Sequence, residues 1–288
     1  MDRTRTFIMT KHGTWILTIV SVALFILLSW VFGDRLFSLP LWNSSDWINS
    51  SLITYLMIVA MLLAGWYQAN GIPESGVTLR LETNPMTPGQ VNDPVAWRLL
   101  LGNVYFALFW LPLRFVLGRD WFSAGSHKLT NPAWMNGGEA LKSFWQQQVV
   151  VPESGKPPIT YDWFRTFLQY MLDHAWYTWF AKLIALGETL VGLGLIVGAF
   201  VGLAAFFGTL MNFNYLLAGT TSTNPVLFAL GIFLVLAWKV AGFWGLDRWL
   251  LPALGTPWYR AKAQVDAVSE LAAQEAEPPF TEPRPSRP

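Results

Sequence analysis

Residues 182–219 form an apolar stretch long enough to cross a bilayer twice, yet the first apolar run carries a carboxylate, Glu188. A carboxylate within a membrane span is costly and marks a functional site by default, with a purely structural role as the alternative. Small side chains on one face of each expected helix favour close packing, because they let helix backbones approach each other. These faces hold Gly187, Val191, Gly194 and Gly198 in the first helix, and Ala204, Gly208 and Asn212 in the second.

The composition is that of an integral membrane protein. Of 288 residues, 53% are hydrophobic and 13% are charged, whereas soluble domains carry about 25% charged residues. The formal net charge is +1 and no run of Lys and Arg occurs, so nucleic acid is not an expected partner.

The chain contains no cysteine, which excludes disulfides, thiol chemistry, iron–sulfur clusters and cysteine-bound zinc within it. Its three histidines are scattered, and scattered histidines do not predict a metal or haem site. A redox role would therefore need a bound cofactor, a substrate such as quinone, or a partner protein.

Four further apolar runs, at residues 14–32, 51–67, 95–118 and 226–245, add to the hairpin. We therefore predict an all-α integral membrane protein with six transmembrane helices, whose third span is kinked at Pro112. Basic residues precede residue 14, and the run at 14–32 is longer than the apolar core of about 7 to 15 residues in a cleaved signal peptide and ends without a small-residue cleavage site, so an uncleaved signal anchor is favoured over a cleaved signal peptide.

The order of these runs predicts four regions. They are an N-terminal two-helix membrane hairpin (1–67), a polar loop rich in Pro and Gly (68–94), a four-helix membrane core (95–251) and a polar, partly disordered tail (252–288). Within the core, residues 119–177 predict a water-facing insertion.

One helix is expected within this insertion, at residues 160–174, with Thr160 as its cap. Its density of aromatic residues favours a position at the lipid interface, and the alternative is a core-facing helix of a small soluble subdomain. The apolar face of this expected helix holds Phe164, Leu168, Met171 and Ala175.

Six spans place both termini on the same side of the membrane. Basic residues near both ends of the chain predict that this side is the cytoplasm. We expect an inner (plasma) membrane protein with both termini cytoplasmic and the 119–177 insertion outside.

Three polar residues are expected at one depth near the outer boundary. Arg114, Glu188 and Asn212 each lie roughly 6 to 9 Å below it, at a helical rise of about 1.5 Å per residue. Arg114 is then the natural ion-pair partner of Glu188, whereas an unpaired Glu188 would tend to be protonated. His127 and Lys128 follow where the third helix leaves the membrane, either to bind an anion or a quinone head group or to solvate the helix end.

Two stretches together resemble the DoxX-like family, in particular the large, DoxD-type subunits of thiosulfate:quinone oxidoreductases. The first is LPLRFVLGRDWFSAGSHKLTNPAWMNGG, and the second is ALGETLVGLGLIVGAFVGLAAFFGTLMNFNYLLAG with the later AWKVAGFWGLDRWL. The resemblance covers about half of the chain, and its matching polar positions are Arg114, Lys128, Glu188 and Asp247. It implies a four-helix membrane bundle that passes electrons from a sulfur compound such as thiosulfate to quinone, together with a partner subunit.

The expected function is therefore a membrane subunit of a quinone-linked oxidoreductase that works with the lipid bilayer, quinone and a partner protein. Glu188 is the expected catalytic residue, a proton relay. The expected quinone-binding residues are Arg114, Asn212, His127 and Lys128. The alternative is a non-catalytic membrane subunit that docks on a larger respiratory or photosynthetic complex.

Overall fold

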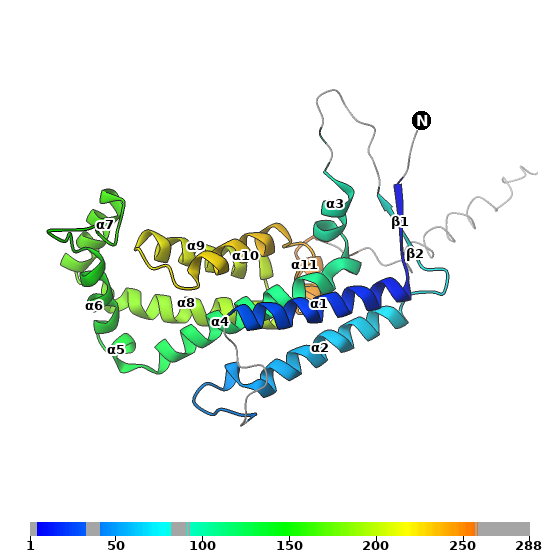
Figure 1. Cartoon of the computed structure of the whole chain (residues 1–288), viewed down its shortest axis with the longest axis horizontal. Coiled ribbons are helices and arrows are strands. Elements are labelled where there is room, and N and C mark those ends of the chain that lie inside the picture. The colour runs from blue at the N-terminus through cyan, green and yellow to red at the C-terminus, as the bar shows by residue number, and fades with distance from the viewer. Residues whose placement is uncertain (1–4, 33–40, 82–90, 92, 257, 259–288) are drawn as a thin grey trace, which may run out of the picture.

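The computed structural model describes residues 5–32, 41–81, 91, 93–256 and 258. Long helices lie roughly side by side, with a small sheet at one end and a group of short helices at the other (Figure 1). In chain order the elements are β1 (Arg5–Met9), α1 (Lys11–Val31), η1 (Trp47–Asn49), α2 (Ser51–Asn70), β2 (Val77–Leu81), α3 (Val95–Gly102), η2 (Val104–Trp110), α4 (Leu111–Thr130), α5 (Pro132–Met135), α6 (Glu139–Gln148), α7 (Asp162–Asp173), α8 (Tyr177–Val197), α9 (Val201–Leu217), α10 (Asn224–Leu236) and α11 (Asp247–Ala253).

Helix α1 is polar inside and apolar outside. Its buried face is mostly hydroxyl-bearing and comprises Thr14, Thr18, Ser21, Phe25 and Ser29. The hydroxyls of Thr18 and Ser21 donate to carbonyls one turn earlier, at 2.8 Å in each case. Large apolar side chains such as Ile16, Ile19 and Trp30 are instead exposed. This distribution suits a helix surrounded by lipid and not by water.

Three described helices are long and apolar enough to cross a membrane: α1, α2 and α8. The pair formed by Val95–Gly102 and Val104–Thr130 would make a fourth span if counted as one, although it is bent by 82°. Helices α9 and α10 are also apolar but are shorter. Three to four such helices are consistent with a membrane protein.

The predicted third span, 95–118, is not one straight helix. The break lies at Asn103, whose side chain accepts a hydrogen bond from the Tyr105 amide and starts η2. Pro112 lies in the first turn of α4, where its missing N–H needs no partner, so the kink predicted at this proline is wrong.

Helix α4 continues to Thr130, so the first residues of the predicted 119–177 insertion belong to a helix of the bundle. The rest of this region forms a cap of short helices, α5 to α7, at one end of α8 (Figure 1). The cap has its own apolar core, which includes Leu141, Trp145, Ile159 and Phe164 together with Ala181 of α8.

The helix predicted at 160–174 is confirmed as α7, but its setting differs from the prediction. Phe164, Leu168 and Met171 are buried in the core of the cap, so this face contacts protein and not lipid. The subdomain alternative is therefore correct for this face. Tyr161, and not Thr160, occupies the N-cap position, and Ala175 lies beyond the helix with a positive φ.

The fold is not purely α-helical, because β1 pairs with β2 as an antiparallel ribbon. The prediction that residues 68–94 are only a loop is thus wrong at β2. An ion pair between Lys11 and Glu74 lies near this ribbon. The predicted disorder of the tail concerns residues that fall largely outside the described part of the chain.

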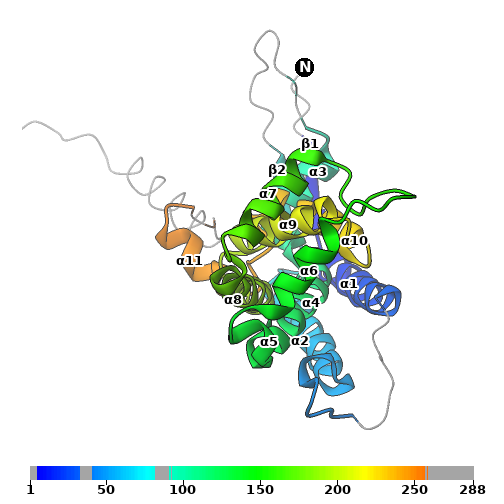
Figure 2. The ribbon, with the colours of Figure 1, turned by 90° about the vertical axis from the view of Figure 1, so that its left-hand side faces the viewer.

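Helices α4 and α8 pack together closely at the centre of the bundle. Viewed along the helices, α9 and α10 lie on one side of this pair and α2 lies on the other (Figure 2). Glycines permit the close approach: a Cβ built at Gly192 would collide with the backbone of Phe122, and one at Gly125 would collide with Thr189. The predicted small-residue faces include neither of these glycines, so the sequence predicts close packing of small residues but not the positions that provide this contact.

Replacing Gly192 by alanine should lower the free energy of unfolding by about 1 to 3 kcal/mol, because the added methyl group overpacks the α4–α8 contact. The matched control is Gly187→Ala on the same helix, where the nearest atom to a new Cβ is Met211 Sδ at 3.7 Å. Thermal unfolding of both purified variants in one detergent measures the difference. Equal melting temperatures would contradict the packing described here.

Candidate functional site

Glu188 lies on α8 and is only 1% exposed. Lys128 Nζ donates to Oε2 at 2.5 Å, and the Tyr215 hydroxyl donates to Oε1 at 2.6 Å. Three helices, α4, α8 and α9, therefore meet at one carboxylate. A buried charge requires this degree of pairing, because an unpaired one is strongly destabilising.

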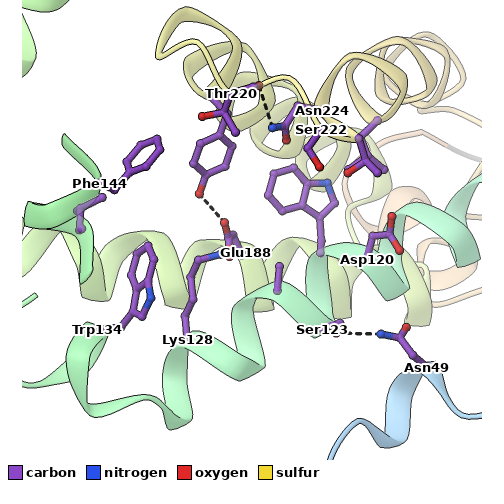
Figure 3. Close-up of a pocket in the computed structure, with 16 residues that line it drawn as sticks. Asn49, Asp120, Ser123, Lys128, Trp134, Phe144, Glu188, Thr220, Ser222 and Asn224 are labelled. Atoms are coloured by element: carbon purple, nitrogen blue, oxygen red, sulfur yellow. Dashed lines mark hydrogen bonds and ion pairs between the residues drawn. The ribbon is translucent and has the colours of Figure 1, made fainter. Parts of the chain in front are cut away.

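Lys128 is held between an acid and an aromatic ring. Its ammonium lies 5.1 Å from the centre of the ring of Trp134. Trp134 belongs to α5, the short helix that follows α4. Figure 3 shows Lys128 extending from the last part of α4 up to Glu188, beside Trp134. The lysine thus retains hydrogen-bond donors close to a surface that a planar ligand can stack on.

A cavity of about 490 Å³ opens beside this group. Its apolar lining includes Trp121, Leu141, Phe144 and Leu227. Its polar lining, apart from Lys128, Glu188 and Tyr215, comprises Asn49, Asp120, Ser123, Thr220, Ser222, Thr223 and Asn224. A concave site that combines apolar walls with convergent polar groups is typical of a small-molecule site, and this cavity is richer in polar side chains than most such sites.

One rim of the cavity is tied to the N-terminal hairpin. Asn49, at the end of η1, donates to Ser123 Oγ at 3.0 Å and to the Asp46 carboxylate at 3.0 Å. The hairpin therefore contributes a lining residue and helps to fix this part of α4.

The structure brings together two of the five residues predicted for the site, Glu188 and Lys128. His127 points elsewhere: its side chain is 56% exposed and its Nε2 lies 3.8 Å from Asp46. It does not line the cavity. Helical geometry explains why Lys128 lines the cavity and His127 does not, because consecutive residues of a helix point in directions about 100° apart.

Arg114 is fully buried but does not pair with Glu188. It donates to four backbone carbonyls, those of Leu195, Ile196, Ala241 and Trp244. The predicted pair is wrong because the expected depth of Arg114 depends on a helix that ends at residue 118. Since α4 runs from Leu111 to Thr130, Arg114 lies about 21 Å from Lys128 along the axis, at 1.5 Å per residue.

Arg114 instead organises the turn between α8 and α9. Asp247 completes this turn, since its carboxylate accepts from the amides of Phe200 at 2.6 Å and Val201 at 3.0 Å. Burial raises the pKa of the Asp247 carboxyl, although these amides and the Arg114 charge act in the opposite direction. Two polar positions that match the DoxX-like pattern, Arg114 and Asp247, are thus structural here.

Asn212 is 1% exposed, and neither its amide nitrogen nor its amide oxygen has a hydrogen-bond partner in the described structure. It does not line the cavity. Tyr215, one turn later on α9, is instead the residue of this helix that bonds to Glu188 and lines the cavity. The three-residue spacing of Asn212 and Tyr215 could have indicated Tyr215 from the sequence, because residues three apart are neighbours on a helix surface.

Among the described residues, no group of three histidine, aspartate or glutamate side chains is placed to hold a metal ion. Comparisons of the chain with protein-family models, curated proteins and solved structures gave no match. The interpretation of the cavity therefore depends on its own geometry and chemistry.

A double-mutant cycle tests the pairing of Glu188. Glu188→Gln combined with Lys128→Met should show a coupling of about 0.5 to 3 kcal/mol, because these side chains are in direct contact. The matched cycle of Glu188→Gln with Arg114→Met should be additive within about 0.5 kcal/mol, since those side chains are far apart. Chemical denaturation of each purified variant gives the free energies. Strong coupling in the second cycle would contradict the arrangement.

Proposed function

We propose that this chain is the membrane subunit of a quinone-linked oxidoreductase and that its cavity binds the quinone head group. The observation that supports this best is the buried Glu188, paired with Lys128 and Tyr215 at the wall of a cavity that apolar and polar side chains line together. The resemblance to DoxX-like proteins agrees with this proposal.

The side chains suit the chemistry of a quinone. Its two carbonyl oxygens accept hydrogen bonds, and the Lys128 ammonium at the cavity wall has N–H donors beyond the one that Glu188 accepts, while the single Tyr215 hydroxyl proton holds Glu188. Reduction to the quinol adds two electrons and two protons. Glu188 is the proton relay in this proposal, because a carboxylate within hydrogen-bond reach can act as a general acid and base.

The surroundings also suit an amphiphilic substrate. Leu186 and Leu190 are exposed on the face of α8 opposite Glu188, because residues two positions apart on a helix point about 160° apart, so apolar surface that can face lipid lies on the far side of this helix. On the side of the cavity, Trp121, Phe144 and Leu227 provide apolar surface that an isoprenoid tail can contact while the head group lies near Glu188.

The electrons must come from outside this chain. It has no cysteine to hold an iron–sulfur cluster or to exchange electrons. We propose that a partner subunit delivers them from a sulfur compound such as thiosulfate.

Tyr215→Phe should lower the turnover of a short-chain quinone analogue about tenfold, because it removes one hydroxyl hydrogen bond. Glu188→Gln should lower it about a hundredfold, through loss of proton transfer. The assay is thiosulfate-dependent reduction of the analogue by membranes that contain the chain and its partner. Tyr161→Phe, which removes an exposed hydroxyl, is the control and should retain full turnover.

Turnover that is unchanged in both Tyr215→Phe and Glu188→Gln would refute a role of this cavity in quinone reduction. Melting temperatures of the same variants separate lost chemistry from lost folding. A well-folded Glu188→Gln variant without turnover would support the proposal.

A docking role is the second candidate, and helix α7 favours it. Next to its buried face, α7 presents an aromatic stripe comprising Trp163, Phe167 and Tyr170, which are 62%, 45% and 49% exposed. Aromatic side chains are enriched where proteins meet partners. In this proposal, a larger membrane complex covers the stripe.

If α7 docks on a complex, Trp163→Ser with Phe167→Ser should abolish a higher-mass assembly on native gels of mild-detergent extracts. The isolated chain should keep its fold, because both side chains lie outside the core of the cap. Thr166→Ala with Gln169→Ala, on the other exposed face of α7, is the matched control. An assembly that survives the aromatic change would exclude this stripe as the docking surface.

A further inference from the structure

A second cavity, of about 370 Å³, lies at the end of the α4–α8 pair opposite Glu188. The turn between α10 and α11 forms most of its lining, which consists of Val197, Phe243, Trp244, Gly245, Leu246, Arg248 and Trp249. Arg114 marks this end of α4, because it bonds to the Trp244 carbonyl. The cavity is therefore separate from the proposed quinone site.

Arg248 carries the positive charge of this cavity. Its guanidinium lies 5.1 Å from the ring centre of Phe243 and 5.8 Å from that of Tyr67. Within the described structure its side chain forms no salt bridge or hydrogen bond. Rings that stack on a guanidinium leave its N–H edge available, and that edge matches the geometry of phosphate oxygens.

A second donor without an acceptor lines the same cavity. The indole Nε1 of Trp244 is buried and has no hydrogen-bond partner among the described residues. A buried polar group without a partner costs free energy. Because this nitrogen is shielded from solvent, a ligand with acceptor oxygens would relieve this cost once the indole ring turns toward the cavity.

The nearest acid does not neutralise Arg248. Asp247 turns away, and its two carboxylate oxygens accept from the amides of Phe200 and Val201. Its charge also acts on the buried Arg114. Asp247 therefore leaves the positive charge of Arg248 without an ion-pair partner among the described residues.

The surroundings are those of a membrane surface. Trp66, Tyr67 and Trp249 are 54%, 57% and 64% exposed at this end, and Trp176 and Trp179 are exposed at the start of α8, near the other end. Trp and Tyr are enriched at the two interfaces between lipid and water. The Arg248 cavity thus lies where lipid head groups are found.

We infer that this cavity binds the phosphate group of an anionic phospholipid, held by Arg248 and Trp244. Leu246 and Trp249 offer apolar surface for the adjoining acyl chains. Basic pockets at the ends of membrane helices recognise anionic lipid head groups in this way. The inference requires a bilayer around the chain but does not depend on quinone chemistry.

Purified full-length chain in a neutral detergent provides the first test. Adding phosphatidylglycerol should raise its melting temperature by about 5 °C at saturation, followed by the fluorescence of its seventeen tryptophans. Phosphatidylcholine and inorganic phosphate at matched ionic strength are the two comparison arms. An equal shift with phosphatidylcholine would overturn the preference for anionic lipid, and an equal shift with inorganic phosphate would assign the site to a soluble anion.

Variants locate the effect. Arg248→Gln should weaken phosphatidylglycerol binding about tenfold or more, because charge-assisted hydrogen bonds are lost. Lys239→Gln is the matched control: it removes one positive charge from an exposed residue outside the cavity, whose ammonium lies over Trp238. Equal weakening by both variants would show general surface attraction and overturn the inference.

Arg248→Lys keeps the charge but loses the forked donor geometry, so it should show intermediate binding. This variant also guards against a folding defect in Arg248→Gln. Native mass spectrometry of the lipid-bound chain measures each affinity directly and independently of melting. Full affinity in both Arg248 variants would exclude Arg248 from the site.

Discussion

The close approach of α4 and α8 is the contact on which the rest of the structure depends. Lipid supplies no hydrophobic drive between membrane helices, so packing and hydrogen bonds must hold them together. Gly192 and Gly125 remove the side chains that would keep the two backbones apart. As a result, Lys128 meets Glu188 at one end of the pair and Arg114 reaches the last carbonyls of α8 at the other.

Each buried charge in this bundle is compensated by neighbours of a different kind. Glu188 uses a lysine and a tyrosine, Arg114 uses backbone carbonyls, and Asp247 uses backbone amides. The last two occur where helices end, because unpaired carbonyls and amides are available there. Of these three residues, only Glu188 also lines the cavity beside Lys128 and Tyr215.

The sequence predicts the features of the fold that depend on composition. It does not predict which side chains of two packed helices face each other. Long apolar runs indicate α1, α2 and α8, and an acid within an apolar run singles out Glu188. The pairing of Arg114 was not predictable, because the polar residues after residue 118 hide the continuation of α4. Tyr215 was overlooked because a tyrosine in an apolar helix is ordinary until its hydroxyl is seen to reach Glu188. The β1–β2 ribbon joins segments that are far apart in the sequence, and no local sequence pattern predicts such a pairing.

The N-terminal hairpin is attached to the core in part through uncharged hydroxyl groups. Arg119 of α4 donates to the hydroxyls of Thr54 at 2.9 Å and Ser29 at 3.3 Å, which belong to the two hairpin helices. Hydroxyl groups carry no charge and do not titrate in the physiological range. These two Arg119 contacts therefore do not depend on the protonation of any carboxylate, unlike the contact between the hairpin and the core at Asp46, Ser123 and His127.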